Sequence, residues 1–162
     1  MKKNDKMPEW GLISNLIDGR EVHRMAHRYA AFGWSIALAP GWTAELREVT
    51  AFGETSVYLA IVPEAKDALL RLTPDERGLI GAHEWVELVG RTNRAKGRRV
   101  SLVQCGDFAG NSVEFVASDE WLRGWALCAD NVQLDANYRC RLSDVGRDDQ
   151  VVDEMLNSLR LE

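Results

Sequence analysis

The stretch from residue 100 to residue 140 constrains the fold most, because it contains four apolar segments separated only by tight turns. The segments read VSLVQCGDF, NSVEFVAS, LRGWALCAD and VQLDANYRC, with the period-2 or continuous apolar patterns typical of strands. Turn signals lie between them at Ala109-Gly110-Asn111, Ser118-Asp119-Glu120 and Asp130-Asn131. Strands joined by such short turns are antiparallel neighbours. This stretch therefore predicts a four-stranded antiparallel meander.

Upstream segments add further strands. Residues 34–39 alternate in polarity before Pro40-Gly41, residues 43–50 form a second segment, and residues 56–63 (SVYLAIVP) are rich in β-branched and aromatic side chains. We expect residues 68–72 to be the hairpin partner of 56–63, with a helix over 64–72 as the competing interpretation. Residues 8–17 fit a short amphipathic helix. Residues 21–29 fit either a helix or an extended arm.

Two longer helices are also predicted. Thr73-Pro74-Asp75-Glu76 has the pattern of a capping box with proline at the first helical position, which predicts a helix from 74 to about 94. Apolar residues then recur at helical spacing up to Val89, and Lys96-Gly97 ends the helix. Near the C-terminus, Asp148 or Asp149 is a candidate cap. An apolar stripe follows it and predicts a helix packed on the sheet, formed by Val151, Val152, Met155, Leu156 and Leu159.

Helices that cover an antiparallel sheet define an α+β domain in layers. The expected organisation is a peripheral segment over residues 1–20 and a single domain over residues 21–162. The chain has 162 residues and a net charge of −5, which argues against nucleic acid as a partner. A basic cluster is interpreted as a solvated helix end and turn; it consists of Arg91, Arg94, Lys96, Arg98 and Arg99.

Sequence patterns also bear on location. No apolar run is long enough to span a membrane, and the first ten residues lack the apolar region of a secretory signal. Three widely spaced cysteines, Cys105, Cys128 and Cys140, fit buried, reduced thiols better than a zinc site. We therefore expect a cytoplasmic protein with no membrane partner.

Catalytic and metal-binding patterns are weak. His23 and His27 would share one face of a helix, but no third ligand is close in sequence and arginines flank both residues. No G-x-S-x-G elbow occurs, and paired carboxylates such as Asp148-Asp149 lie where they cap helices or turns. The sequence thus predicts no metal, no cofactor and no enzymatic activity. The alternative is an enzyme or small-ligand binder with a pocket near His23 and His27.

Tryptophans supply the candidate contact residues. Trp34, Trp85 and Trp125 lie on apolar faces and are expected in the core, whereas Trp10, Trp42 and Trp121 lie near element ends. Because tryptophan is enriched at protein contact sites, these last three are interface candidates, together with His23 and His27. Packing at the rim of the core is the competing interpretation for each tryptophan.

Several of these segments together resemble the PsbP/DcrB/Ran-binding Mog-type superfamily. The likeness covers residues 30–161 and is carried by GWSIALAPGW, GDFAGNSVEF, WALCADNVQLDANYRC and VVDEMLNSLRL. It implies an α/β/α sandwich with an antiparallel sheet. Members are mostly not enzymes but bind proteins: a small GTPase, the photosystem or, in secretion-system chaperones, the apolar helices of a toxic effector.

No binding motif of one member matches residue by residue, so no functional residues are carried over. The lack of a signal or lipid-attachment cysteine departs from the DcrB and PsbP branches. The resemblance predicts a domain that binds another protein, such as a bacterial immunity protein or an effector chaperone of a secretion system.

Overall fold

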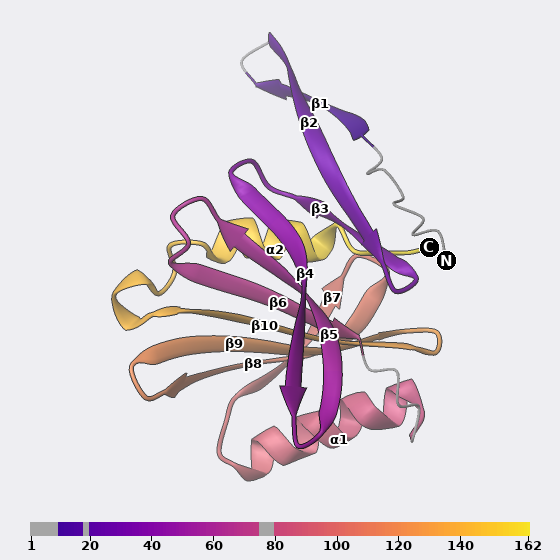
Figure 1. Ribbon diagram of the computed structural model, residues 1–162, viewed down its shortest axis with the longest axis vertical. Helices are drawn as coiled ribbons and strands as arrows, with labels where there is room; N and C mark the ends of the chain where they lie inside the picture. Colours follow the sequence, from indigo (N-terminus) through magenta and orange to yellow (C-terminus); the bar gives the residue numbers. More distant parts are fainter. Residues whose placement is uncertain (1–9, 18–19, 75–79) are drawn as a thin grey trace.

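A computed structural model describes residues 10–17, 20–74 and 80–162, which form two antiparallel sheets and two α-helices (Figure 1). The larger sheet has seven strands in the order β4 (Trp42–Ala51), β5 (Glu54–Pro63), β6 (Ala68–Pro74), β10 (Val132–Arg141), β9 (Glu120–Ala129), β8 (Phe108–Ala117) and β7 (Val100–Cys105). The smaller sheet has the order β1 (Trp10–Ile17), β2 (Arg20–Ala31), β3 (Trp34–Leu38) and β11 (Arg160–Leu161). The helices are α1 (Ala82–Ala95) and α2 (Asp149–Asn157), and a short 3-10 helix, η1 (Leu142–Asp144), precedes α2. This architecture confirms the predicted α+β class and the meander β7–β10.

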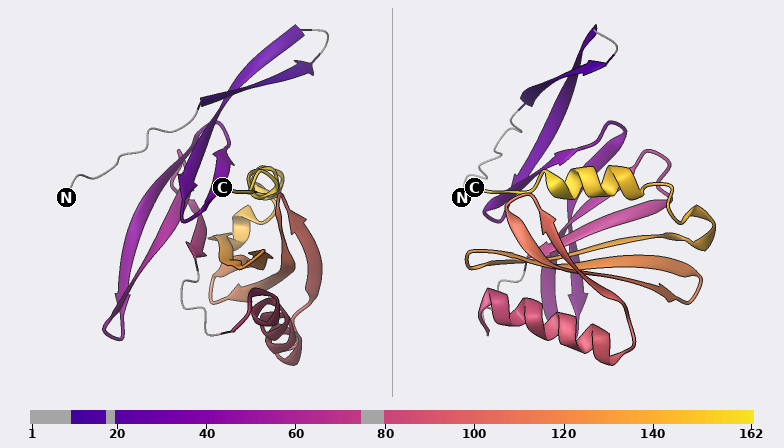
Figure 2. Two further views of the ribbon diagram at one scale, coloured as in Figure 1. Left: turned by 90° about the vertical axis from the view of Figure 1, so that its right-hand side faces the viewer. Right: turned by 180° about the vertical axis from the view of Figure 1, so that it is seen from behind.

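The two helices lie on opposite faces of the larger sheet. Asn111 of β8 donates from Nδ2 to the backbone carbonyl of Val86 in α1 at 2.8 Å. Arg123 of β9 donates to Asp153 of α2 at 2.9 Å. Asn111 lies opposite Ala126 in the ladder, so the two side chains share one face of the sheet. Ala126 and Arg123 are three positions apart in β9, and because side chains alternate between the faces of a strand, they point to opposite faces. Figure 2 (left) accordingly shows α2 and α1 at opposite ends, with the meander strands between them.

The main core lies between the α2 face of the larger sheet, α2 itself and β3. The apolar stripe predicted for the last helix is confirmed, since Val152, Met155, Leu156 and Leu159 are buried and Val151 packs against them. Trp34 and Ile36 of β3 enter the same core. The three cysteines are free and buried, as predicted.

The first two segments of the described chain are extended. Residues 8–17 were expected to form a helix, but Trp10–Ile17 is strand β1, which pairs antiparallel with β2 in a register from Trp10↔His27 to Ile17↔Arg20. Residues 21–29, for which both conformations were open, belong to β2. The ladder supplies the backbone hydrogen bonds that a helix would otherwise have made. The prediction that residues 68–72 pair with residues 56–63 is confirmed, since they lie in strand β6, which pairs antiparallel with β5.

The capping-box prediction at Thr73-Pro74 is wrong. Both residues end β6, where Thr73 pairs with Asp135 of β10, and α1 starts only at Ala82 with Gly81 as its N-cap. Residues 75–79, which include the rest of the predicted box, lie outside the described residues. Pairing with β10 thus overrides a local helix signal. The predicted end of the helix is confirmed, because α1 ends at Ala95 and Gly97 follows with a φ of +75°.

The turn predicted at Ala109-Gly110-Asn111 is also misplaced. β7 and β8 are joined by Gly106-Asp107, and Gly106 has a φ of +60°, whereas Ala109, Gly110 and Asn111 lie inside β8. Gly110 is required there by space rather than by backbone angle, since an added Cβ would lie 1.8 Å from the carbonyl oxygen of Ala126. The other two predicted turns are confirmed.

Within the described ranges, no helix combines the length and apolar character that a bilayer crossing requires.

Candidate functional site

A cleft opens between the C-terminal half of α1 and the face of the larger sheet beneath it. Its cavity volume is about 330 Å³. Apolar side chains predominate in the lining, which comes from α1, from the loop after it and from β7, β8, β9 and β10. The residues that line this α1 cleft include Val89, Gly90, Asn93, Arg98, Val100, Asn111, Val113, Phe115, Leu122, Gly124, Ala126, Asp135 and Asn137.

Small residues determine where α1 touches the sheet and where space remains. Gly90 of α1 lies directly over Asn111, so closely that an added Cβ would be 2.6 Å from Asn111 Nδ2. Further along the same face, Gly124 has no side chain, and a Cβ built there would meet only Val113, at 3.4 Å, among atoms within 4 Å. The helix is therefore anchored at Asn111, and the missing side chain at Gly124 leaves the floor of the cleft open.

Arg98 is held at the mouth of the cleft. Its guanidinium lies 3.7 Å from the centroid of the Phe115 ring, a cation–π contact. Its Nη1 donates to Asn93 Oδ1 at 2.9 Å, and Asn93 in turn donates to the carbonyl of Val89 at 2.9 Å. Because Arg98 is fixed on two sides, a positive charge is held beside an apolar cavity.

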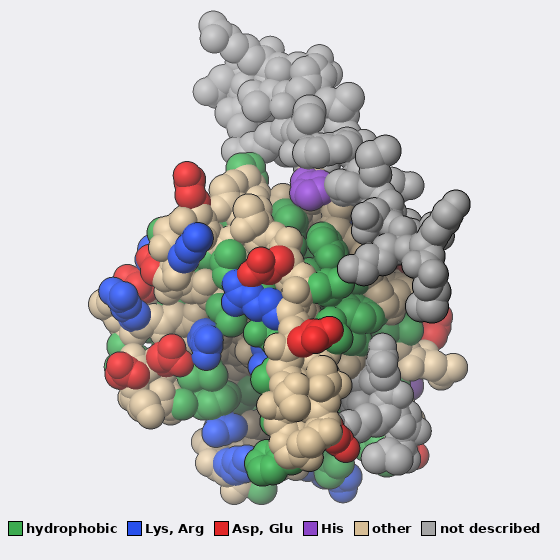
Figure 3. Space-filling model, in the orientation of Figure 1, with side chains coloured by type: hydrophobic (Ala, Val, Ile, Leu, Met, Phe, Trp, Pro, Cys, Tyr) green, Lys and Arg blue, Asp and Glu red, His purple; other side chains and the backbone are tan. Residues whose placement is uncertain are grey.

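The rest of the predicted basic cluster is exposed, as expected for a solvated helix end; these side chains are Arg91, Arg94, Lys96 and Arg99. Arg98 is the exception, since it is half-buried and lines the cleft. On the face shown in Figure 3, acidic and basic side chains are interspersed with hydrophobic ones, so neither sign of charge dominates this view.

Among the described residues that line the cleft, none is a cysteine or a histidine. In the part of the chain that the structure describes, no group of three or more His, Cys, Asp or Glu side chains could hold a metal ion. The Sγ of Cys128 lies 3.7 Å from Nδ1 of His83, a pairing that sequence spacing did not single out. Burial raises the pKa of the Cys128 thiol, so the reactive thiolate is disfavoured.

The predicted interface residues whose side chains are described lie away from the cleft. Trp121 is 9% exposed and packs in the core, with its ring centroid 6.3 Å from that of Tyr138, and Trp42 is half-buried against the core. His27 is half-buried in β2. Trp10 and His23 lie in β1 and β2, and their side chains are outside the described part. Of the three whose side chains are described, Trp42, Trp121 and His27, none lines the α1 cleft.

The remaining tryptophans follow their predictions in two cases of three. Trp34 and Trp125 are buried in the core, whereas Trp85 of α1 is only half-buried.

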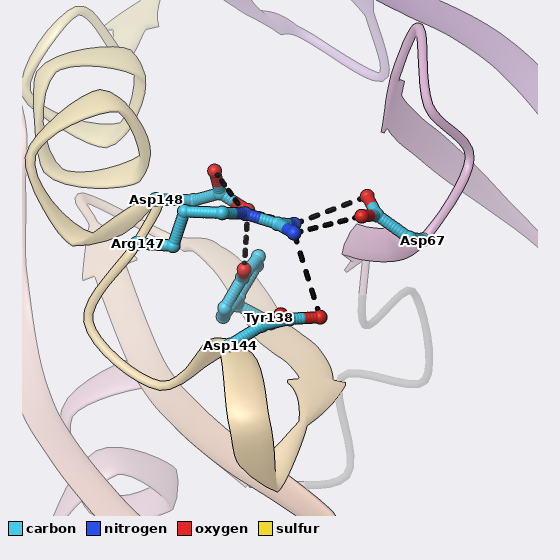
Figure 4. A network of polar contacts seen from close by, with 5 residues as sticks. All are labelled: Asp67, Tyr138, Asp144, Arg147 and Asp148. Carbon is cyan, nitrogen blue, oxygen red and sulfur yellow. Dashed lines mark hydrogen bonds and ion pairs between the residues drawn. The ribbon is translucent and has the colours of Figure 1, made fainter.

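A polar network fixes the start of α2 to the rest of the molecule (Figure 4). Arg147 donates from Nη1 and Nη2 to the two carboxylate oxygens of Asp67, at 2.7 and 3.0 Å, and from Nη2 to Asp148 at 2.9 Å. Asp148 also accepts the hydroxyl of Tyr138 at 2.7 Å, and Asp144 lies 3.4 Å from Arg147. One guanidinium thus joins three carboxylates and ties the start of α2 to Asp67, which precedes β6; we call this network the clamp.

The pKa values of residues in the clamp are shifted. Hydrogen bonds from Arg147 lower the pKa of Asp148, against an opposing effect of burial. Burial raises the pKa of the Tyr138 hydroxyl, and its hydrogen bond to Asp148 acts in the same direction.

The sequence analysis missed the residues that form the cleft. Arg98 was assigned to a solvated turn, and Gly124 and Val113 were assigned only to strands. The sequence contained one signal for the cleft. Gly124 and Ala126 are two positions apart in β9 and share one face, and small residues on a strand face leave room for a covering helix. Which helix covers it follows only from the tertiary structure.

Comparisons with known proteins show a likeness in fold only. No model of a known family matches the chain, and no curated protein matches its sequence. A crystal structure from Bacteroides thetaiotaomicron VPI-5482, at 1.50 Å resolution, matches with a TM-score of 0.63 and 11% identity, over 83% of this chain and 48% of that one. The solution structure of cyanobacterial PsbP (CyanoP) from Synechocystis sp. PCC 6803 matches with a TM-score of 0.49 and 13% identity, over 83% of this chain and 91% of that one.

The chain thus spans about half the length of the Bacteroides protein. A PsbP structure is among those it resembles, as the sequence predicted, and this resemblance is one of fold alone.

Proposed function

We propose that this chain is a non-catalytic domain that binds another protein, and that an apolar side chain of the partner enters the α1 cleft. The observation that carries the proposal is an apolar cavity of about 330 Å³ whose mouth is ordered by Arg98. Binding energy at protein interfaces is concentrated in a few side chains that fill well-packed pockets. A cleft of this kind suits such an anchor.

The charge at the mouth indicates the chemistry of the partner. Arg98 lies in the cleft, and exposed Arg94, Lys96 and Arg99 lie close to it in sequence. A partner segment with an apolar residue flanked by acidic side chains complements this arrangement, and complementary charge favours both association rate and specificity. The net charge of −5 does not alter this local argument.

The finer proposal is a cytoplasmic bacterial accessory protein, such as an immunity protein or an effector chaperone of a secretion system. It is supported by the superfamily resemblance of the sequence.

The test is affinity purification from the native host with three forms of the full chain. Gly124→Leu fills the cleft from its floor, and Ala51→Leu adds the same kind of bulk at the exposed end of β4 as the matched control. We expect a protein that the wild type and Ala51→Leu retain and that Gly124→Leu loses. Equal retention by all three forms, or the absence of any specifically retained protein, would contradict the proposal.

A second candidate is binding of a small amphipathic anion. The specific observation is that the cavity volume of about 330 Å³ falls at the lower end of the range of small-molecule sites, roughly 300–1,000 Å³. The fluorescent anion 1-anilinonaphthalene-8-sulfonate is a suitable probe. Saturable binding of one equivalent, lost in Gly124→Leu and weakened in Arg98→Gln, would favour this function; unsaturable binding that both variants leave unchanged would exclude it. A pocket near His23 and His27 stays a sequence prediction.

A further inference from the structure

The two edges of the larger sheet differ in how they are protected. In the described part of the chain, β4 lies at one edge and β7 at the other. Natural edge strands avoid pairing with other chains by carrying charges or proline. β4 carries Glu45, Arg47 and Glu48, whereas β7 reads VSLVQC and contains neither a charge nor a proline. β7 is therefore the unprotected edge.

The turn after β7 determines which of its backbone groups face outward. A two-residue turn, Gly106-Asp107, joins it to β8, so the closing pair Cys105↔Phe108 exchanges hydrogen bonds. Bonded pairs then alternate along the ladder. Val100, Leu102 and Gln104 consequently direct their N–H and C=O groups away from β8. Leu102, at the centre, has 84% of its surface exposed.

We propose that β7 pairs antiparallel with β7 of a second copy of this chain, which joins the two larger sheets into one. Strands pair through the backbone N–H and C=O groups that point away from β8. Val100, Leu102 and Gln104 therefore face the same three residues of the second copy. The register with the longest overlap places Leu102 opposite Leu102 and Val100 opposite Gln104. The two exposed leucines then cover each other at the two-fold axis.

Charge and symmetry favour a second copy over another occupant. Arg99 precedes β7 and Asp107 follows it, and both are exposed. In the antiparallel register, Arg99 of one copy lies opposite Cys105 of the other. Asp107, whose carboxylate accepts the Leu161 N–H, follows two residues later in the turn, so each end of the interface brings opposite charges toward each other. The interface closes on itself, and the charged strand β4 remains as the edge on both sides. Pairing β7 with β4 instead would give an open, head-to-tail array.

The oligomeric state of the full chain tests the proposal by sedimentation equilibrium. We expect a dimer for the wild type. Leu102→Lys places two like charges opposite each other and should weaken the dimer at least tenfold. Leu46→Lys is the matched control, since Leu46 is an exposed leucine (49%) on the other edge strand, and it should leave the dimer intact. A monomeric wild type, or a dimer equally stable in Leu102→Lys, would overturn the proposal.

A second pair of variants tests the register and keeps the proposal falsifiable if Leu102→Lys misfolds. Directly bonded antiparallel pairs have Cα atoms about 5.5 Å apart, a separation that a disulfide bridges. Leu102→Cys should therefore form an intermolecular disulfide under mild oxidation. Ser101→Cys, whose side chain points to the other face and is offset from its counterpart, should cross-link much more slowly. Equal cross-linking of both variants, or of neither, contradicts the register. Leu102 does not line the α1 cleft, and Val100, which does, pairs with the second copy through its backbone, so Gly124→Leu should leave the dimer unchanged.

Discussion

Replacing Gly110 with alanine should destabilise the protein strongly, whereas the same change at Gly124 should not. Both glycines lie in the interiors of neighbouring strands, β8 and β9, and neither has a positive φ. A Cβ at Gly110 would lie 1.8 Å from the carbonyl oxygen of Ala126 and 2.9 Å from its carbonyl carbon. A Cβ at Gly124 would enter the open α1 cleft and meet only Val113 at 3.4 Å.

The structure sets the expected magnitudes. At Gly110 the colliding atoms belong to the backbone of β9, so the contact must open from 1.8 Å to at least 3.0 Å by separating two central strands. Overpacking of this kind costs about 1–3 kcal/mol, and a backbone collision belongs at the upper end. For a chain of this size, about 3 kcal/mol corresponds to a fall in Tm of roughly 6–12 °C. At Gly124, loss of chain entropy in the unfolded state should stabilise the alanine variant by about 0.4–1 kcal/mol.

Urea unfolding monitored by tryptophan fluorescence measures both changes, since Trp121 and Trp125 are buried on β9. If Gly110→Ala unfolds at the same urea concentration as the wild type, Gly110 does not lie against the backbone of β9. If Gly124→Ala is as damaging as Gly110→Ala, the floor of the cleft is not open. Either result would refute the reasoning.

Three further predictions concern the anchoring of α1, the buried cysteines and the clamp. Asn111→Leu removes the hydrogen bond from the Asn111 side chain to the Val86 carbonyl, which anchors α1. The free energy of unfolding should fall by about 1–3 kcal/mol, and amide hydrogen exchange in α1 should become faster. Unchanged exchange would contradict the anchoring role of Asn111. The three cysteines are buried, and burial raises the pKa of the Cys105 thiol to about 11. We therefore expect no reaction of the three thiols with a disulfide reagent in the folded protein and reaction of all three after unfolding. Rapid labelling of the folded chain would contradict their burial. Because Arg147 lowers the pKa of Asp148 in the folded state, the clamp stabilises the protein above the unfolded carboxyl pKa of about 3.9 and loses this effect as the pH falls through the lowered value. The free energy of unfolding, measured from about pH 6 to about pH 2, should therefore fall more steeply with decreasing pH in the wild type than in Arg147→Gln. Parallel curves for the two proteins would argue against the clamp.

The sequence predicted those parts of the fold in which local pattern and tertiary structure agree. The meander and the final helix are of this kind, since the stripe from Val151 to Leu159 has helical spacing and the core that it fills lies directly beneath it. The Thr73-Pro74 signal failed because pairing of β6 with β10 extends to these two residues. Such pairing is a long-range effect, which no window of local sequence reveals.

Gly110 shows the same limit at the level of one residue. Its neighbours Ala109 and Asn111 made it look like a turn, but the reason for glycine is the proximity of Ala126, sixteen positions further along the chain. The α1 cleft could not be predicted for a related reason. Its lining comes from a helix, the loop after it and four strands, and only the docking of α1 through Asn111 brings Arg98 next to Phe115.

The most direct test of the central claim is the affinity of the purified partner for the wild type and for Gly124→Leu, measured by isothermal titration calorimetry. Burying one Leu- or Phe-sized side chain contributes about 1.5–3 kcal/mol, and each 1.4 kcal/mol is tenfold in Kd. The account predicts that Gly124→Leu binds at least about tenfold more weakly, while the Ala51→Leu control binds like the wild type. Equal affinity of Gly124→Leu and wild type would contradict the claim that the α1 cleft receives a side chain of the partner.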